Sequence, residues 1–210
     1  MRKAMAQSEE ELKVIVFDLN KTFYKKSSKD EFYEFICTKR PKRLGYFFQM
    51  TYYKLLRQLH QIRKTEFKEN FFNYLDKIPP EQVEAYATEF WEKEYPVNFN
   101  EELKGHFDSM KRQGVRLFCA TGGLELYVAP LFRLYEIDGY AGTQVAYNGE
   151  TYKVLGRACK DEEKVCRIER HYEGKPFRVT EAYSDSKEDI LDIAEKSFLL
   201  KDGKIKPYNK

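Results

Sequence analysis

The feature that most constrains the fold of this chain is a run of four apolar residues that ends in a carboxylate. Residues 14–17 lead directly into Asp18, and Asn20 follows two positions later. A continuous apolar run bounded by polar residues is typical of a strand buried on both faces of a parallel sheet. Ligands of such sheets bind in the crevice beyond the carboxyl ends of the strands. We therefore expect Asp18 and Asn20 to lie at a functional site.

Beyond that strand, the chain alternates between segments of strand and helix character. Gly114 ends one expected helix as a left-handed cap, and Asn148-Gly149 predicts a type I′ turn between two short strands. The expected helices cover residues 101–113, 124–135, 162–172 and 189–196, and the expected strands residues 115–120, 143–147, 151–155 and 177–183. This alternation predicts an α/β fold with a doubly wound, mostly parallel sheet.

An inserted helical segment separates the first strand from the second. From about residue 24 onward, glycines are few and apolar residues recur at helical spacing, with Pro41 and the pair Pro79-Pro80 as breaks. We expect three to five helices here. The predicted division is a core domain of residues 1–23 and 99–210 and a helical domain of residues 24–98.

Composition narrows the class of protein. A length of 210 residues suits one core domain with a modest insertion, and 42% hydrophobic with 34% charged residues is typical of a soluble globular protein. The net charge of +3 is too balanced to indicate a nucleic-acid partner. Residues 1–11 lack the apolar core of a signal peptide, and no apolar run approaches transmembrane length. Four cysteines without a Cys-x-x-Cys pair favour a reducing, cytoplasmic location.

Four segments, in order, resemble the motifs of the haloacid dehalogenase (HAD) superfamily. The resemblance covers residues 12–200. The segment Asp18-Leu19-Asn20-Lys21-Thr22 is similar to motif I, and residues 117–123 are similar to motif II. Residues 156–159, together with Lys164, are similar to motif III of the phosphoserine-phosphatase-like branch. Residues 183–189 are similar to motif IV. The resemblance implies an α/β core with an inserted helical cap that closes over a phosphate site.

The resemblance also implies the chemistry of that site. Asp18 would be the nucleophile that forms an aspartyl-phosphate. The carboxylates of Asp18 and Asp185, with the backbone carbonyl of Asn20, would hold Mg²⁺, because this cation accepts one or two carboxylates with water and phosphate oxygens.

Motifs II to IV would supply the remaining groups. Thr121 and Gly122, at an expected helix N-terminus, would bind the phosphate through a hydroxyl and backbone amides. Lys164 would neutralise the nucleophile and the phosphoryl oxygens, and Asp189 would orient Lys164 or a metal-bound water. Each residue alone could serve as a turn, a helix cap or a solvated charge, but their joint order favours chemistry.

Asn20 departs from the motif, because hydrolytic members carry Asp at this position. That Asp protonates the leaving oxygen and then activates water against the aspartyl-phosphate. An amide forms hydrogen bonds but does not exchange that proton at neutral pH. Loss of a general acid-base costs roughly 10² to 10⁴ in rate.

Four functions therefore stay open. The expected one is a Mg²⁺-dependent phosphatase that hydrolyses a phosphate monoester through Asp18, with water or another carboxyl moving the proton. The alternative is a catalytically impaired or inactive phospho-ligand binding protein. A third is an enzyme held inactive by a substitution introduced at Asn20. A carbon-centred dehalogenase is the fourth, which Lys164 and the Asp185/Asp189 pair disfavour.

The inserted segment carries a basic and aromatic stretch. Lys39 to Arg43 precedes a run rich in Phe, Tyr and Leu with interleaved cations. Such a helix can lie on an anionic membrane, which would suit a lipid-linked phosphomonoester as well as a small-molecule one. The stripe Phe47, Leu55 and Leu59 is more typical of helix packing, so we expect a packed stripe with solvated charges around it.

Overall fold

The computed structural model describes residues 11–201 and 203–209, so the prediction for the first ten residues lies outside the described part. A six-stranded sheet in the order β3-β2-β1-β6-β7-β8 forms the core. Its first five strands run parallel, and β8 pairs antiparallel with β7 at the edge. The strands are β1 (Leu12–Phe17), β2 (Arg116–Leu124), β3 (Gly139–Thr143), β6 (Phe177–Ser184), β7 (Lys196–Lys201) and β8 (Lys204–Pro207). The predicted doubly wound, mostly parallel sheet is confirmed.

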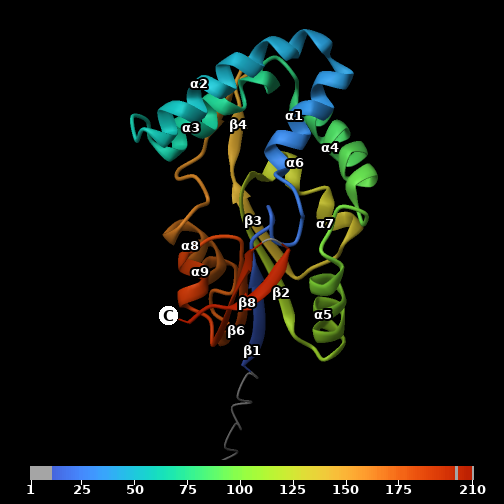
Figure 1. Cartoon of the computed structure of the whole chain (residues 1–210), viewed down its shortest axis with the longest axis vertical. Helices are drawn as coiled ribbons and strands as arrows, with labels where there is room; N and C mark the ends of the chain where they lie inside the picture. Colours follow the sequence, from blue (N-terminus) through green and yellow to red (C-terminus); the bar gives the residue numbers. More distant parts are fainter. Residues whose placement is uncertain (1–10, 202, 210) are drawn as a thin grey trace, which may run out of the picture.

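Side chains of β1 alternate between two apolar cores, one on each face of the sheet. Ile15 and Phe17 pack into one core, where the ring centroid of Phe17 lies 4.8 Å from that of Phe107. Val14 and Val16 pack into the other, beneath the last two helices. The flanking helices are α5 (Glu101–Arg112), α8 (Glu162–His171) and α9 (Asp189–Asp192), visible on the two sides of the sheet in Figure 1. Burial on both faces explains the unbroken apolar run of β1.

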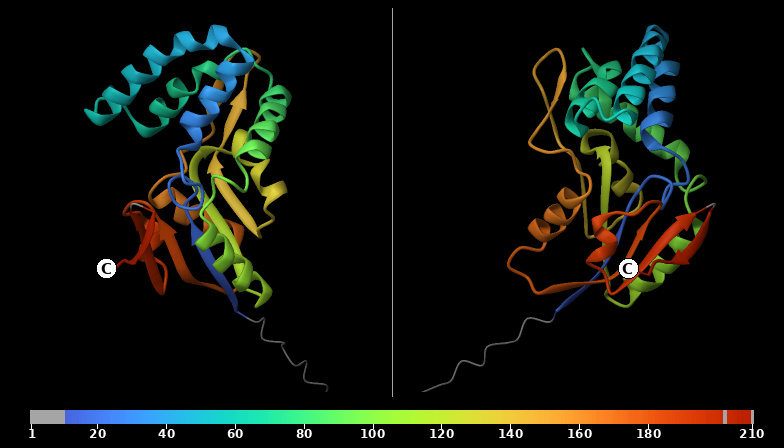
Figure 2. Two further views of the ribbon diagram at one scale, coloured as in Figure 1. Left: turned by 45° about the vertical axis from the view of Figure 1, so that its right-hand side comes forward. Right: turned by 60° about the vertical axis from the view of Figure 1, so that its left-hand side comes forward.

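The inserted segment forms a helical layer above the carboxyl ends of the strands (Figures 1 and 2). It comprises α1 (Ser28–Lys39), η1 (Pro41–Gly45), α2 (Tyr46–Gln58), α3 (Lys64–Phe71), η2 (Asn73–Leu75) and α4 (Pro80–Glu94). Along the chain, these helices lie between β1 and β2, as predicted. We refer to these helices as the cap.

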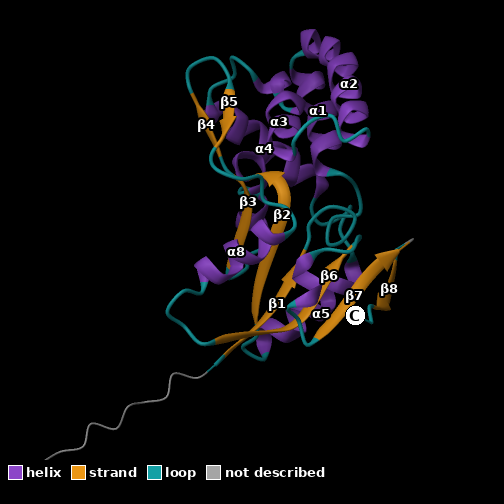
Figure 3. Cartoon of the chain, turned by 90° about the vertical axis from the view of Figure 1, so that its left-hand side faces the viewer, coloured by secondary structure: helices purple, strands orange, loops and turns teal. Residues whose placement is uncertain are grey.

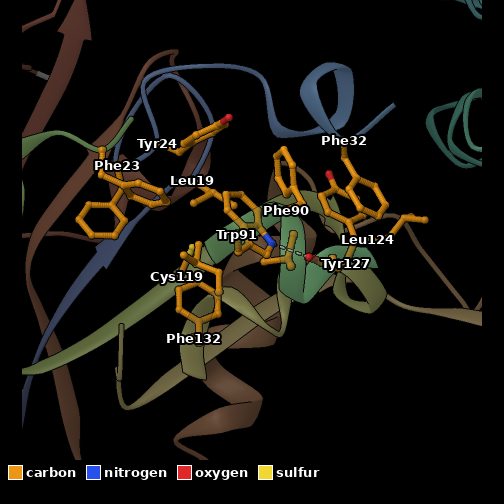
Figure 4. Close-up of a cluster of buried hydrophobic side chains, with 14 of the residues drawn as sticks. Leu19, Phe23, Tyr24, Phe32, Phe90, Trp91, Cys119, Leu124, Tyr127 and Phe132 are labelled. Carbon is orange, nitrogen blue, oxygen red and sulfur yellow. Dashed lines mark hydrogen bonds between the residues drawn. The ribbon is translucent and has the colours of Figure 1, made fainter. Parts of the chain in front are cut away.

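Aromatic packing fixes the lower ends of the cap helices to the core. The indole of Trp91 donates a 2.6 Å hydrogen bond to the backbone carbonyl of Tyr127, and the Tyr127 ring stacks on Phe32 at 4.9 Å between centroids (Figure 4). Tyr127 belongs to the short helix α6 (Glu125–Val128), which follows β2. The cap and the core thus share one apolar cluster.

Several elements differ from the sequence prediction. The helix expected over residues 124–135 is two short ones, α6 and α7 (Leu131–Leu134), with Pro130 between them. The helix expected over residues 189–196 ends at Asp192, because the chain turns into the additional strand β7. The antiparallel edge strand β8 was not predicted.

The predicted hairpin forms, but its turn and its neighbours differ from expectation. Its strands are β4 (Val145–Tyr147) and β5 (Tyr152–Val154), and only Gly149 of the predicted turn pair has a positive φ, so the turn is not type I′. The Asn148 side chain accepts the backbone N–H groups of Glu150 and Thr151 instead. The hairpin extends toward the cap helices (Figure 3), and Tyr152 donates to the carbonyl of Ile78 at 2.7 Å. We propose that it belongs with the cap.

The cap's outer helix differs most from expectation. The stripe Phe47, Leu55 and Leu59, predicted to pack, is more than half exposed on α2. Met50 on the opposite side of α2 is buried instead. Within the described residues, no helix has the length and apolar character needed to cross a membrane.

Candidate active site

The carboxyl ends of two neighbouring strands bring two carboxylates to one pocket. Asp18 follows β1 and Asp185 follows β6, and these strands pair in parallel at the centre of the sheet. Burial raises the pKa of Asp185, and the charge of Asp18 raises it further. The two carboxylates therefore repel each other, and a cation placed between them would relieve that repulsion.

Lys164 is the buried cation that balances this cluster. It lies in the first turn of α8 and is 1% exposed. Its Nζ donates to Asp18 Oδ1 at 2.6 Å and to Glu188 Oε2 at 2.6 Å. Burial by itself lowers the pKa of Lys164, but the charges of Asp18 and Glu188 outweigh it, and the pKa lies well above its usual range. Lys164 therefore stays protonated throughout the neutral range.

Glu188, and not the predicted Asp189, is the second carboxylate on Lys164. Glu188 also accepts from the Ser184 hydroxyl at 3.2 Å, which fixes its position beside the strand end. Asp189 is the first residue of α9 and does not line the pocket. The carboxylate that orients Lys164 is therefore one position before the predicted one, because the chain between β6 and α9 directs the side chain of Glu188 to the amine. The alternative role of Asp189, orienting a metal-bound water, stays a prediction.

The side-chain amide of Asn20 links the cap to the core. Its Oδ1 accepts the backbone N–H of Ser28, the first residue of α1, at 2.7 Å. Its Nδ2 donates to Thr121 Oγ1 at 3.3 Å. Asn20 therefore satisfies one of the free N–H groups at the start of α1 and holds it beside motif II.

The motif II glycines extend β2 beyond Ala120, where the strand was expected to end. Residues 121–124 continue β2, and α6 starts only at Glu125. The Thr121 hydroxyl is fully buried and accepts the Gly123 N–H at 3.2 Å. A Cβ on Gly123 would lie 2.8 Å from the Tyr127 hydroxyl oxygen, so this position has no room for a side chain. Gly122 and Gly123 line the pocket, whereas the side chain of Thr121 supports Asn20.

The cap closes the pocket opposite Asp18. The pocket has a volume of about 310 Å³, which suits a small ligand. Lys29 of α1 lines it, with its Nζ 5.1 Å from the ring centroid of Phe71 and 5.6 Å from that of Phe67. Burial lowers the pKa of Lys29. Among the described residues Lys29 has no ion pair, whereas its neighbour Asp30 is paired with Lys54 at 2.8 Å.

The donor set of the pocket fits Mg²⁺. Among the residues that the structure describes, no three or more His, Cys, Asp or Glu side chains are grouped to hold a metal. Mg²⁺ does not need such a group, since one or two carboxylates, a carbonyl, water and a phosphate oxygen complete its octahedron. Asp18, Asp185 and the backbone carbonyl of Asn20 are oxygen donors of this kind. The crowded negative charge around Asp185 also fits a bound cation.

Sequence reasoning missed Glu188, Lys29, Lys160 and Tyr127 as pocket residues. Glu188 could have been found as the extra carboxylate within the Asp185 to Asp189 run. Lys29 lies on a highly charged helix and has no local signal, because its aromatic neighbours come from α3 through tertiary packing.

Comparison with known proteins decides the family. The model of the haloacid dehalogenase-like hydrolases matches residues 15–191. The chain belongs to this family. No curated protein matches the sequence significantly.

Solved structures share the fold at low sequence identity. A protein of unknown function from Bordetella pertussis Tohama I is 17% identical, with a TM-score of 0.72 and 89% of each chain covered. A phosphoserine phosphohydrolase-like protein from Francisella tularensis subsp. tularensis SCHU S4 is 20% identical, with a TM-score of 0.59, covering 89% of this chain and 86% of that one. A phospho-aspartyl intermediate analogue of phosphoserine phosphatase is 16% identical, with a TM-score of 0.56 and coverage of 90% and 86%. This HAD-like hydrolase therefore shares its fold with phosphoserine phosphatase and with a phosphoserine phosphohydrolase-like protein.

Proposed function

We propose that this HAD-like protein is a phosphatase that cleaves a small phosphate monoester through an aspartyl-phosphate on Asp18. The observation that carries the proposal is the ion-paired cluster of Asp18, Lys164 and Glu188 in the pocket beneath the cap. A buried lysine held by two carboxylates places positive charge beside the nucleophile, where phosphoryl oxygens would sit. The phospho-aspartyl analogue of a structurally similar protein supports the same chemistry here.

The reaction has two displacements at phosphorus. In the first, an Asp18 carboxylate oxygen forms a bond to phosphorus while the bond to the leaving-group oxygen breaks, and that oxygen takes a proton from water. In the second, water attacks the phosphorus of the aspartyl-phosphate, the acyl-phosphate bond breaks and inorganic phosphate leaves. The proton of the attacking water passes to solvent or to a carboxylate of the pocket, because the amide of Asn20 does not accept a proton. Gly122, which lines the pocket, is the proposed phosphate-binding residue of motif II, and Thr121, whose buried hydroxyl accepts from Asn20 and from the Gly123 N–H, is proposed to position it. Asp189 would orient a metal-bound water, the other role predicted for it.

Asp18, Asp185 and the Asn20 carbonyl are the proposed ligands of Mg²⁺. When bound, the ion supplies Lewis-acid stabilisation of negative charge on the phosphoryl oxygens. Asn20 retains the backbone carbonyl that an Asp would offer, so the substitution leaves the proposed ligand set intact.

Mg²⁺ should raise the melting temperature at pH 7.5 by roughly 4–8 °C, corresponding to about 2 kcal/mol of ligand stabilisation. The pKa of Asp185 is raised on folding, so in metal-free protein its contribution to stability is full at acid pH and is lost as the pH rises through that pKa. Bound Mg²⁺ would restore this stability by taking the place of the proton on Asp185. The rise in melting temperature on adding Mg²⁺ should therefore be smaller at pH 5 than at pH 7.5. Differential scanning fluorimetry with and without EDTA measures both shifts. An Asp185→Asn variant that keeps the full shift would contradict the ligand assignment.

The second candidate, a phospho-ligand binding protein with little turnover, is favoured by the bonding of Asn20. Both polar atoms of its amide take part in joining Ser28 to Thr121. A protein that needed only to bind a phosphate and close its cap would keep this bridge. It would bind the ligand without releasing phosphate.

Phosphate release from a panel of phosphomonoesters in Mg²⁺ tests the proposed function. We expect turnover that an Asp18→Asn variant loses, with higher kcat/KM for substrates that carry a second acidic group, because Lys29 lines the pocket and has no ion pair with any residue that the structure describes. A panel in which the protein never exceeds Asp18→Asn would contradict a phosphatase and leave the binding protein. We also propose a cytoplasmic location, since all four cysteines are free thiols.

A further inference from the structure

We propose that the outer face of α2 binds the surface of an anionic phospholipid membrane. This inference is independent of the proposed catalytic function. It rests on an exposed apolar face, on the charge of the segment that carries it and on its place in the fold.

The apolar face lies on one side of α2 and continues at both ends of the helix. Its six members are all more than half exposed, and Phe48 reaches 78%: Leu44, Phe47, Phe48, Tyr52, Leu55 and Leu59. At 3.6 residues per turn, the four within the helix fall in an arc of roughly 140°. That arc also contains Thr51 and Gln58 but no charged residue. We call these six residues the α2 face.

The rest of α2 is anchored to the protein. Met50 is buried, and Tyr46 and Tyr53 pack against the apolar core from the side opposite the α2 face. The helix is therefore held in place while its outer face stays open. Six large apolar side chains on one exposed face indicate an interaction surface, whereas single exposed ones do not.

The segment that carries this face has charged residues of one sign, although Lys39 and Lys54 within it are ion-paired with Glu89 and Asp30 of other helices. Residues 35–65 contain eight Lys and Arg and no Asp or Glu, although the whole chain carries 37 basic and 34 acidic residues. Lys42 lies beside the start of α2 and Arg63 beyond its end, and both are exposed. An apolar strip flanked by cations matches the boundary between acyl chains and anionic headgroups.

Its place in the fold makes the face accessible to a flat surface. The α2 helix forms the outermost edge of the cap, at the end of the molecule remote from the base of the sheet (Figures 1 and 3). A second copy of the chain is a poorer occupant, because a two-fold contact would set the same cationic segment against itself.

Sedimentation with phospholipid vesicles tests the proposal. We expect binding to vesicles of phosphatidylcholine with phosphatidylglycerol to be at least about tenfold tighter than to phosphatidylcholine alone, and to weaken as salt screens the cations. The double variant Phe48→Asp/Leu55→Asp should lose at least about tenfold in affinity, and Lys42→Glu/Arg63→Glu should lose the preference for anionic lipid. Val97→Asp, at an exposed apolar residue outside the α2 face, is the matched control and should bind like the parent.

Circular dichroism and the melting temperature verify that each variant is folded. Absence of vesicle binding, or equal binding to neutral and anionic vesicles, would overturn the proposal. So would self-association, measured by light scattering, that Phe48→Asp/Leu55→Asp abolishes in a protein that binds no vesicles.

Discussion

Lys164→Met should destabilise the folded protein by about 3–5 kcal/mol at pH 7.5 in EDTA, and it should abolish phosphate release. The substitution leaves Asp18 and Glu188, both beside the buried ammonium in the parent, as uncompensated negative charges. The pKa of Glu188 is already raised by burial and by the charge of Asp18, and removing Lys164 would raise it further. Urea unfolding measures the loss.

The pH dependence separates this electrostatic effect from a packing effect. A carboxyl whose pKa is raised on folding contributes its full stability at low pH and loses it as the pH rises through that pKa. The cost of Lys164→Met should therefore shrink between pH 7.5 and pH 5, as Glu188 takes up a proton. Lys160→Met, at an exposed lysine of the same pocket, is the control and should change stability by less than about 0.5 kcal/mol. A cost for Lys164→Met below about 1 kcal/mol at pH 7.5 would contradict the account.

Asn20→Asp should accelerate phosphate release by roughly 10² to 10⁴, the usual contribution of a general acid-base. The structure accommodates the carboxylate without rearrangement. One oxygen would keep accepting the Ser28 N–H, and the other would accept from the Thr121 hydroxyl, which can donate as readily as it now accepts. Steady-state phosphate release from one substrate, for both proteins, measures the gain.

Asn20→Ala is the matched control for this prediction. It removes the bridge between Ser28 and Thr121 and leaves the Ser28 N–H without its acceptor, which should cost about 1–3 kcal/mol of stability with no gain in rate. An Asn20→Asp protein that is folded but no faster than the parent would show that proton transfer at this position does not limit the reaction.

The three central strands β1, β2 and β6 and the active edge at their carboxyl ends could be predicted from the sequence, because local patterns determine them, whereas β3, β7 and β8 were not predicted. The apolar run before Asp18 has to be buried on both faces, and motifs II and IV lie at the ends of β2 and β6 for the same reason, whereas Lys164 of motif III comes from α8. The structure accordingly brings Asp18, Lys164 and Asp185 into one pocket. The residues that distant packing places could not be predicted in this way. Lys29 reaches the pocket only because α3 sets Phe67 and Phe71 behind it.

The errors in the prediction have physical causes. The strand of motif II was expected to end at Ala120, but pairing with β3 extends it to Leu124. Glu188 and Asp189 are adjacent carboxylates, and only the path of the chain after β6 selects the one that meets Lys164. The α2 stripe has the spacing of a packed helix, and nothing in that spacing says whether a neighbouring element covers it.

The central claim, an aspartyl-phosphate on Asp18, is tested most directly by rapid mixing of the protein with p-nitrophenyl phosphate in Mg²⁺. This substrate has an acidic leaving group that needs no proton donor, whereas hydrolysis of the intermediate still lacks the base that Asn20 replaces. We predict a burst of nitrophenolate close to one equivalent per active site, then slow turnover, with the phosphate found by mass spectrometry on Asp18. The absence of both a burst and a phosphorylated Asp18, or a burst that survives in Asp18→Asn, would contradict the account.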